Sequence, residues 1–206
     1  SCLHQSSLGT LMLIAPTKMN PLWYTPILPA LFLMSAIMVG FPMIVFEGMI
    51  ATRSFRRPSE VPVLSSLARI IPMFLFGYLA VKIGDLAVRD MLPRLIDGTL
   101  ESGLFLVEVG FGVVLPMLLL LVPRVRKSGA GLFVSATLVV LGVAMNRINV
   151  FLVAYNPPYA TRSYFPSPFE FLVTAGLIAT LVLVYRFLVL NLPVLEATTP
   201  AEEVRR

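Results

Sequence analysis

Long apolar runs, separated by short polar and basic loops, make up most of the chain. Five of the runs are long enough, at 1.5 Å per residue, to cross a hydrocarbon core of about 30 Å as helices. The pattern therefore predicts an all-α integral membrane protein, built as a transmembrane helix bundle. We expect one partial span and then five complete spans, at about Ser1–Ala15, Pro26–Ala51, Leu64–Val88, Gly103–Val122, Gly131–Ala154 and Phe169–Leu190.

The first apolar run is too short to cross a bilayer by itself. A helix from Ser1 to Ile14 would measure roughly 21 Å, and the run lacks the charged segment that opens a signal peptide. We therefore expect the 206 residues to be the carboxyl-terminal part of a longer protein. Within them, residues 1–192 would form the bundle and 193–206 a cytoplasmic tail. Pro72 is expected to kink the third span.

Basic residues are distributed unevenly between the two sides of the predicted bundle. One side carries Arg53, Arg56, Arg57, Arg124, Arg126, Lys127, Arg205 and Arg206. The other side carries only Lys18, Arg89, Arg94 and Arg162. The positive-inside rule then places the carboxyl terminus in the cytoplasm and the loops at 16–25, 89–102 and 155–168 outside. Trp23 and Tyr24 in the first outer loop suit the headgroup layer.

The composition agrees with a membrane protein and limits the redox centres that this chain can form. The chain is 57% hydrophobic and 13% charged, with a mean hydropathy of +0.88, whereas soluble domains are about 25% charged. One cysteine and one histidine exclude an intrachain disulfide, a four-cysteine iron–sulfur cluster and a bis-histidine haem made by this chain alone. A histidine–methionine haem stays open, but nothing places such a pair. We expect no metal site, and the +5 net charge indicates topology rather than nucleic-acid binding.

Four polar residues follow one another along the third span. Tyr78, Lys82, Asp85 and Arg89 are 4, 3 and 4 residues apart, which places them on one stripe of a helix. Ionisable side chains at membrane depth usually face a protein interior or a wet cavity, where they mark a ligand or proton path. The alternative is a structural ion pair between Lys82 and Asp85 that locks two helices together.

The helical rise places six groups in one layer below the outer ends of their helices: Tyr78, Lys82, Asp85, Glu108, Arg147 and Glu170. Asn146 and Arg147 offer donors suited to a carbonyl or carboxylate. For these residues, and more so for Asn149, the alternative is hydrogen bonding between helices. Glu108 is either the counter-ion of Arg147 or a proton relay. Glu170 lies near a helix N-terminus, where an anion is favoured in any case.

Two further ionisable residues lie outside that layer. His4, beside Gln5, falls near mid-membrane. Its alternative role is that of a core histidine bonded to a neighbouring carbonyl. Glu47 has no cation within one turn and suggests proton entry from the inner leaflet, unless Arg69 pairs with it and makes it structural.

Four segments together resemble one known family: His4-Gln5-Ser6-Ser7-Leu8-Gly9-Thr10-Leu11, Pro21-Leu22-Trp23-Tyr24, Asn146-Arg147-Ile148-Asn149-Val150 and Tyr164-Phe165-Pro166-Ser167. They are similar to the NrfD/PsrC-type quinone-interacting membrane subunits. Within that group, the resemblance is to the HybB-like membrane subunits of NiFe hydrogenases, and it extends over essentially the whole chain.

The resemblance implies a periplasm-facing hydrogenase complex in a bacterial or archaeal cytoplasmic membrane. NiFe hydrogenase large and small subunits and a ferredoxin-like iron–sulfur subunit would supply electrons. This multi-pass subunit would anchor the complex in lipid and pass the electrons, with protons, to a quinone, most naturally menaquinone. It would contain no haem or iron–sulfur cluster of its own and would bind no nucleic acid.

On this interpretation, six residues border the quinone head group: His4, Tyr78, Lys82, Asp85, Asn146 and Arg147. Glu47 and Glu108 would transfer protons. Two alternatives stay open. One is a subunit of the same superfamily that serves a polysulfide, nitrite or sulfoxide reductase. The other is a proton- or solute-coupled transporter, a class that usually shows paired repeats with broken helices.

Overall fold

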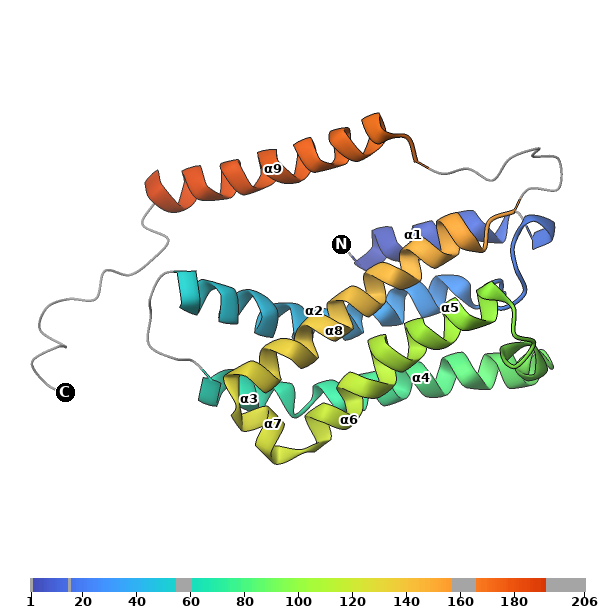
Figure 1. The fold of residues 1–206 in the computed structure, drawn as a ribbon, viewed down its shortest axis with the longest axis horizontal. Helices are drawn as coiled ribbons and strands as arrows, with labels where there is room; N and C mark the ends of the chain where they lie inside the picture. Colours follow the sequence, from blue (N-terminus) through green and yellow to red (C-terminus); the bar gives the residue numbers. More distant parts are fainter. Residues whose placement is uncertain (1, 15, 55–60, 157–165, 192–206) are drawn as a thin grey trace, which may run out of the picture. The chain divides into compact units, whose positions relative to one another are not determined.

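The computed structural model describes residues 2–14, 16–54, 61–156 and 166–191, and these are helical almost throughout (Figure 1). The α-helices are α1 Cys2–Leu13, α2 Leu28–Ser54, α3 Val61–Ala68, α4 Ile71–Val88, α5 Leu100–Val109, α6 Leu115–Leu121, α7 Pro123–Lys127, α8 Gly129–Ile148 and α9 Pro168–Asn191. The shorter elements are the 3₁₀ turns η1 Pro16–Lys18 and η2 Leu92–Leu95 and the π-helical turns η3 Gly110–Val114 and η4 Asn149–Val153.

Five helical segments are long and apolar enough to cross a membrane, and they match the five complete spans predicted from the sequence. They are Leu28–Ser54, Val61–Val88, Leu100–Leu121, Gly129–Val153 and Pro168–Asn191. The helix α1, with 12 residues, is roughly 18 Å long and corresponds to the predicted partial span. The third span is interrupted between α3 and α4, directly before Pro72, because proline lacks the N–H that would continue the helix.

The chain divides into two compact units, residues 1–163 and 164–206. The first unit holds α1 to α8. The second contains α9, an apolar helix whose side chains are exposed along nearly its whole length. The single bundle predicted over residues 1–192 stays a prediction, and the predicted tail at 193–206 lies outside the described residues.

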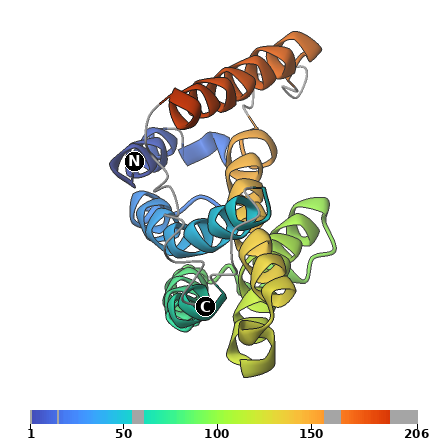
Figure 2. The same ribbon diagram turned by 90° about the vertical axis from the view of Figure 1, so that its left-hand side faces the viewer.

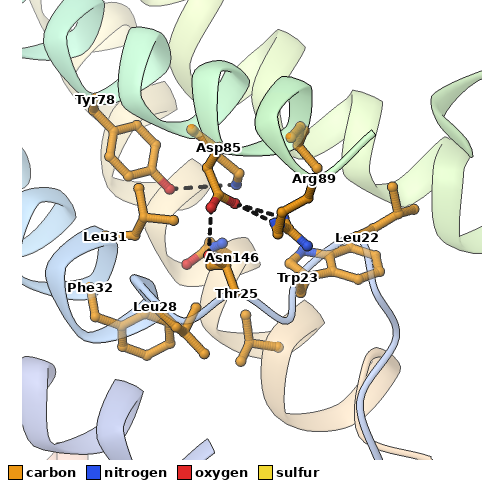
Figure 3. A pocket seen from close by; sticks show the side chains of 13 residues that line it. Leu22, Trp23, Thr25, Leu28, Leu31, Phe32, Tyr78, Asp85, Arg89 and Asn146 are labelled. Atoms are coloured by element: carbon orange, nitrogen blue, oxygen red, sulfur yellow. Dashed lines mark hydrogen bonds and ion pairs between the residues drawn. The ribbon is translucent and has the colours of Figure 1, made fainter. Parts of the chain in front are cut away.

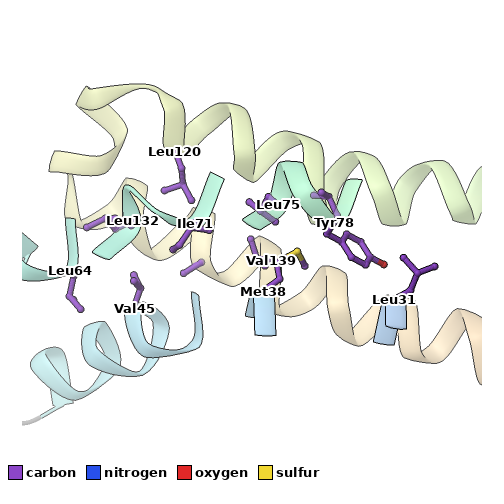
Figure 4. Packing of buried hydrophobic residues seen from close by; sticks show 13 residues of the cluster. Leu31, Met38, Val45, Leu64, Ile71, Leu75, Tyr78, Leu120, Leu132 and Val139 are labelled. Carbon is purple, nitrogen blue, oxygen red and sulfur yellow. The ribbon is translucent and has the colours of Figure 1, made fainter. Parts of the chain in front are cut away.

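Buried side chains in the first unit repeat every seven residues along three segments. In α2 they are Leu31, Met38 and Val45; in α3 and α4, Leu64, Ile71 and Tyr78; in α8, Leu132, Val139 and Asn146. Positions seven residues apart face the same side of a helix, as in a coiled-coil seam. The apolar members pack into one core (Figure 4). Because Tyr78 and Asn146 continue two of these seams, the same repeat directs them into the interior.

Glycines allow backbones to touch where the fourth and fifth spans cross. A Cβ added to Gly142 of α8 would lie 2.2 Å from the Cα of Gly112 in η3, and one added to Gly112 would lie 2.6 Å from the Cα of Gly142. Small residues permit such approaches between membrane helices. The two spans are antiparallel (Figures 1 and 2), so Glu108, four residues before Gly112, comes level with Asn146, four residues after Gly142.

The helix α1 also packs through a glycine. A Cβ on Gly9 would lie 2.8 Å from the Cα of Pro29 near the start of α2. The chain then turns back through the loop of residues 20–27. The amide of Asn20 donates to the carbonyl of Ala154 at 2.8 Å, and the amide of Asn156 donates to the carbonyl of Lys18 at 2.7 Å. These bonds join the loop to the end of the fifth span and bring its side chains over the polar ends of α4 and α8.

Candidate functional site

A cluster of polar side chains is buried between α4, α5, α8 and the loop of residues 20–27. Lys82 is 6% exposed, Glu108 3%, Asn146 7% and Asn149 2%. A charge within a membrane span is costly unless it is paired and hydrogen-bonded. The partners of these groups therefore determine what the cluster can do.

Glu108 lies at the centre of the cluster and accepts four hydrogen bonds. Its Oε1 accepts from the ammonium of Lys82, with which it forms an ion pair, and from the amide of Asn146 at 2.8 Å. Its Oε2 accepts from the indole of Trp23 at 3.0 Å and from the amide of Asn149 at 2.8 Å. A carboxylate offers about four lone-pair positions, so this one has none left free. Glu108 thereby joins α4, α5, α8 and the loop.

The ammonium of Lys82 has a second set of partners on its other side. It lies 3.4 Å from the hydroxyl oxygen of Tyr78, one turn earlier on α4, and 4.7 Å from the centre of the Phe105 ring. An aromatic face attracts a cation, so both contacts help to keep the charged amine inside the bundle. Tyr78 is itself buried.

Arg147 is linked to the cluster through its neighbour and not by a direct pair with Glu108. Its guanidinium donates to Asn146 Oδ1 at 2.7 Å, to Gln5 Oε1 at 2.9 Å and to Ser35 Oγ at 2.7 Å. Counter-ion of Arg147 was one of two roles considered for Glu108, and the direct ion pair of Glu108 is with Lys82 instead. Asn146 is hydrogen-bonded both to Glu108 and to Arg147. Gln5 of α1 accepts from Arg147 and so extends the network to α1.

A second network lies one turn further along α4. Arg89 donates to Asp85 Oδ2 from Nε at 2.9 Å and from a terminal nitrogen at 2.6 Å, while Thr25 donates to Asp85 Oδ1 at 2.6 Å (Figure 3). The other terminal nitrogen of Arg89 donates to the carbonyls of Pro21 and Tyr24 at 2.8 and 2.6 Å. The pair therefore clamps the loop that delivers Trp23 to Glu108.

The ion pair between Lys82 and Asp85, considered as the structural alternative, does not form. Lys82 pairs across the bundle with α5, and Asp85 pairs with Arg89 on its own helix. The two residues are near neighbours along α4, but Asp85 is closer to the helix end and meets the loop, whereas Lys82 faces α5. Each charge is thus neutralised by a different segment.

A small cavity separates the two networks. Its polar lining includes the side chains of Thr25, Tyr78, Lys82, Asp85, Arg89 and Asn146. Its free volume is about 20 Å³. That volume holds one water molecule, and an aromatic ring does not fit. The predicted polar groups are therefore brought together, but the space among them is not an open slot for a quinone head group.

Three of the remaining predicted residues of the first unit lie outside this cluster. His4 is exposed on α1, and its neighbour Gln5 makes the contact with Arg147 instead. Glu47 is exposed on α2, and Arg69 is exposed between α3 and α4. Among the described residues, no ion pair joins the two. Glu170 lies in the first turn of α9, in the second unit, where its carboxylate accepts from Ser167 at 3.0 Å.

Several residues of the site escaped the sequence analysis. Trp23, expected in the headgroup layer, is 3% exposed and donates to Glu108. Asn149, for which structural bonding between helices was favoured, does bond between helices, and its partner is the central carboxylate. Its spacing of three from Asn146 places both amides on one helix face, which was a usable signal. Gln5 and Thr25 carried no comparable signal, because their partners lie far away in the sequence.

The clamp leads to a prediction for Arg89→Gln. Loss of the guanidinium removes the ion pair with Asp85 and both bonds to the loop carbonyls, and bonds to charged groups contribute about 1.5–3 kcal/mol each. We expect faster proteolysis within residues 20–27 and a lower unfolding temperature of the purified protein. Arg94→Gln, an exposed arginine of η2, is the matched control. Equal proteolysis of both variants would contradict a clamping role.

Comparison with known proteins identifies the family to which the chain belongs. Residues 6–158 match the family model described as "Polysulphide reductase, NrfD". A protein of Nitratidesulfovibrio vulgaris, described only as "Protein", is 36% identical over 204 residues, which are 95% of this chain and 52% of that protein. The "Probable Ni/Fe-hydrogenase 2 b-type cytochrome subunit" of Escherichia coli is 34% identical over 196 residues, 94% of this chain and 50% of that subunit.

The chain thus spans about half the length of the curated relatives that it matches. No solved structure matches it.

Proposed function

Because the chain belongs to the NrfD family of membrane subunits, we propose that it is the quinone-reactive membrane subunit of a periplasm-facing NiFe hydrogenase complex. It anchors the complex, receives electrons from a ferredoxin-like iron–sulfur partner and passes them with protons to a quinone such as menaquinone. The similarity to a subunit named for hydrogenase 2 supports the type of complex. The buried network around Glu108 supports the chemistry and is the observation that carries the proposal.

The network provides a hydrogen-bonded route for protons. Tyr78, Lys82 and Glu108 can each give up or take a proton, and they are hydrogen-bonded in series. Asn146, Arg147 and Gln5 continue the hydrogen bonds toward α1 and hold that series in place, because amides and a guanidinium do not pass protons on. Reduction of a quinone to a quinol consumes two protons, and the bilayer core supplies none. A line of groups with exchangeable protons, buried in an apolar domain, meets that need. Electrons come from the partner, because one histidine and one cysteine do not form a bis-histidine haem or a four-cysteine cluster in this chain.

We place the quinone head on the exposed face of α1 and not inside the cluster. His4, Leu8 and Leu11 are spaced four and three residues apart, so they share one helix face, and all three are exposed. The imidazole is a donor for a quinone carbonyl, while the two leucines contact the apolar ring and tail. Gln5, next to His4, connects this face to Arg147 at 2.9 Å.

Protons would come from the cytoplasmic side in this proposal. The excess of basic residues supports a cytoplasmic position for the ends of α2 and α8 near Arg53 and Lys127 and for the carboxyl terminus. Glu47, exposed on α2 four residues before Ala51, is the proposed entry group in that half of the membrane. Glu108 is the proposed proton-transfer group within the buried network. A proton can bind there only by displacing one of its four donors.

Replacement of His4 by alanine tests the position of the quinone. We expect the assembled complex to lose at least about tenfold in quinone-linked hydrogen oxidation, since one positioned donor contributes on the order of tenfold to a thousandfold. Hydrogen oxidation with a soluble dye should be unchanged, because the dye takes electrons before the membrane subunit. Ser7→Ala is the control, since Ser7 is exposed on the same short helix and bonds only to its own helix at Leu3. Unchanged quinone reduction in the His4 variant would remove this residue from the site.

A subunit of another reductase is the second candidate, because the matching family model carries the description of polysulphide reductase. Purification of the native complex separates the two. We expect the large and small NiFe hydrogenase subunits and an iron–sulfur subunit to co-purify. Recovery of a polysulfide-, nitrite- or sulfoxide-reducing catalytic subunit would favour the second candidate. Recovery of the membrane protein without any redox subunit would favour a transporter.

A further inference from the structure

We propose that the cavity between α4, α8 and the loop of residues 20–27 binds one ordered water molecule, which joins the two buried networks into a single proton-conducting chain. The water site follows from the geometry alone. Its role in proton supply rests on the proposed function, and the experiments below test the two separately.

The size and lining of the cavity suit one water. Its free volume of about 20 Å³ exceeds the 10–15 Å³ that a water needs and is too small for a larger molecule. Buried waters occupy polar sites where they make about three hydrogen bonds. Tyr78, Lys82 and Asp85 all contribute to the wall of this cavity, so enough polar partners surround it.

The hydrogen-bond inventory leaves buried donors that face this space. The hydroxyl of Tyr78 accepts from Lys82, and an ammonium can only donate. The phenolic proton of Tyr78 therefore needs another acceptor, and the described residues supply none. Lys82 uses two of its three N–H groups, on Tyr78 and Glu108. Both residues are buried, and a buried donor without an acceptor costs about 1–3 kcal/mol.

Asp85 supplies the matching acceptor on the other side of the cavity. Its Oδ2 takes two bonds from Arg89, but its Oδ1 takes only one, from Thr25. A carboxylate oxygen has room for a second donor. One water can accept the phenolic proton of Tyr78 and donate to Asp85 Oδ1, which satisfies groups that no direct contact satisfies.

The water completes a balanced proton transfer between the networks. Asp85 takes a proton from the water, the water takes the phenolic proton of Tyr78, and Tyr78 takes a proton from the ammonium of Lys82. Each inner group gives up one proton as it receives one. The net result is one proton moved from Lys82 to Asp85. The reverse sequence returns a proton to the Lys82 amine, which lies beside Glu108. Without the water, no bond between described residues connects Asp85 to Tyr78.

The first experiment asks only whether the water is bound. A structure of the full-length complex at a resolution that shows ordered solvent should contain one water at about 2.7–3.0 Å from the Tyr78 hydroxyl and Asp85 Oδ1. The same site should lose its water in Tyr78→Phe, which removes the donor but keeps the ring. A dry cavity in the wild-type complex would overturn the proposal, whatever the complex is found to reduce.

The second experiment asks whether the water carries protons. Val150 borders the cavity and is fully buried, so Val150→Ile adds one methylene there and displaces the water without removing a polar group. We expect Val150→Ile and Tyr78→Phe each to slow quinone-linked turnover about tenfold or more, with dye-linked hydrogen oxidation intact. Tyr24→Phe is the control, because Tyr24 lies in the same loop but does not border the cavity.

The outcomes separate the two claims. Slow turnover in both variants, with the water lost from both structures, supports the conducting chain. Slow turnover in Tyr78→Phe with normal turnover in a dehydrated Val150→Ile would overturn it, because Tyr78 would then act without the water. If the wild-type water is seen and the full complex shows no quinone-linked turnover, the proposed function fails and the water site stands. The wild-type structure decides the site even if Val150→Ile does not fold.

Discussion

Replacement of Glu108 by alanine is expected to leave little folded protein in the membrane. The change strands the buried ammonium of Lys82 and removes the acceptor for Trp23, Asn146 and Asn149. Breaking one partner of a buried ion pair costs about 3–5 kcal/mol, and a protein is usually stable by only 5–15 kcal/mol. The abundance of the subunit in isolated membranes and the thermal unfolding of the purified complex measure the effect.

The double variant Lys82→Met/Glu108→Leu tests whether the damage comes from the stranded charge. Removal of both charges should make the double variant more stable than Glu108→Ala, as is found for other buried pairs replaced by apolar residues. The recovery of stability should be incomplete, because the neutral donors of Trp23, Asn146 and Asn149 still lack an acceptor. Glu101→Ala, in the first turn of the same helix, is the control. If the stability losses of Lys82→Met and Glu108→Leu, each made alone, add up to the loss in the double variant, Lys82 and Glu108 are not coupled.

Gly142→Ala is expected to force α8 away from η3 and to cost several kcal/mol. The new Cβ would lie 2.2 Å from a backbone atom of Gly112, and backbone cannot move aside as a flexible side chain can. Overpacking a core costs about 1–3 kcal/mol and sometimes more, and a contact this short belongs at the upper end. Because Asn146 is one turn from the contact, we expect its bond to Glu108 to lengthen as the spans separate.

Unfolding temperature in detergent and quinone-linked turnover should therefore both fall in Gly142→Ala. Gly84→Ala in α4 is the matched control, since nothing lies within 4 Å of a Cβ there and alanine is favoured over glycine in a helix by about 1 kcal/mol. A stable and active Gly142→Ala protein would show that the two spans are not held in direct backbone contact.

Positions of helices were predictable from this sequence because a bilayer imposes a minimum apolar length. All five predicted complete spans correspond to helices with nearby ends, and the break before Pro72 follows from the chemistry of proline. The depth of a residue along its helix was predictable in the same way. This explains why Tyr78, Lys82 and Glu108 were expected at one level and are found together.

Pairing between helices was not predictable, because it depends on the rotation of each helix and on segments distant in sequence. Lys82 was matched to Asp85, its near neighbour, but its partner is Glu108, 26 residues away. Trp23 looked like a membrane-surface aromatic because its loop is short and polar. The bonds from Arg89 to the carbonyls of Pro21 and Tyr24, together with the bond from Asn20 to the carbonyl of Ala154, hold that loop against the bundle.

Seven-residue repeats were the unused signal for helix rotation. Leu64, Ile71 and Tyr78 form one series and Leu132, Val139 and Asn146 another, and each runs from apolar residues into a polar one. Such a series indicates that the polar member faces the interior rather than lipid. The rotation of α1 had no comparable pattern, so the exposure of His4 could not be derived from its position in the chain.

The order in which the partners of Glu108 are synthesised has a consequence for biogenesis. Lys82 leaves the ribosome before Glu108, and Asn146 and Asn149 follow 38 and 41 residues after the glutamate. At about 5–20 residues per second, the 26 residues between lysine and glutamate take about one to five seconds. During that delay the insertion machinery has to shelter a lone cation from the lipid. Nascent chains arrested between α4 and α5 should therefore remain cross-linkable to the translocon, whereas chains arrested beyond α8 should be released.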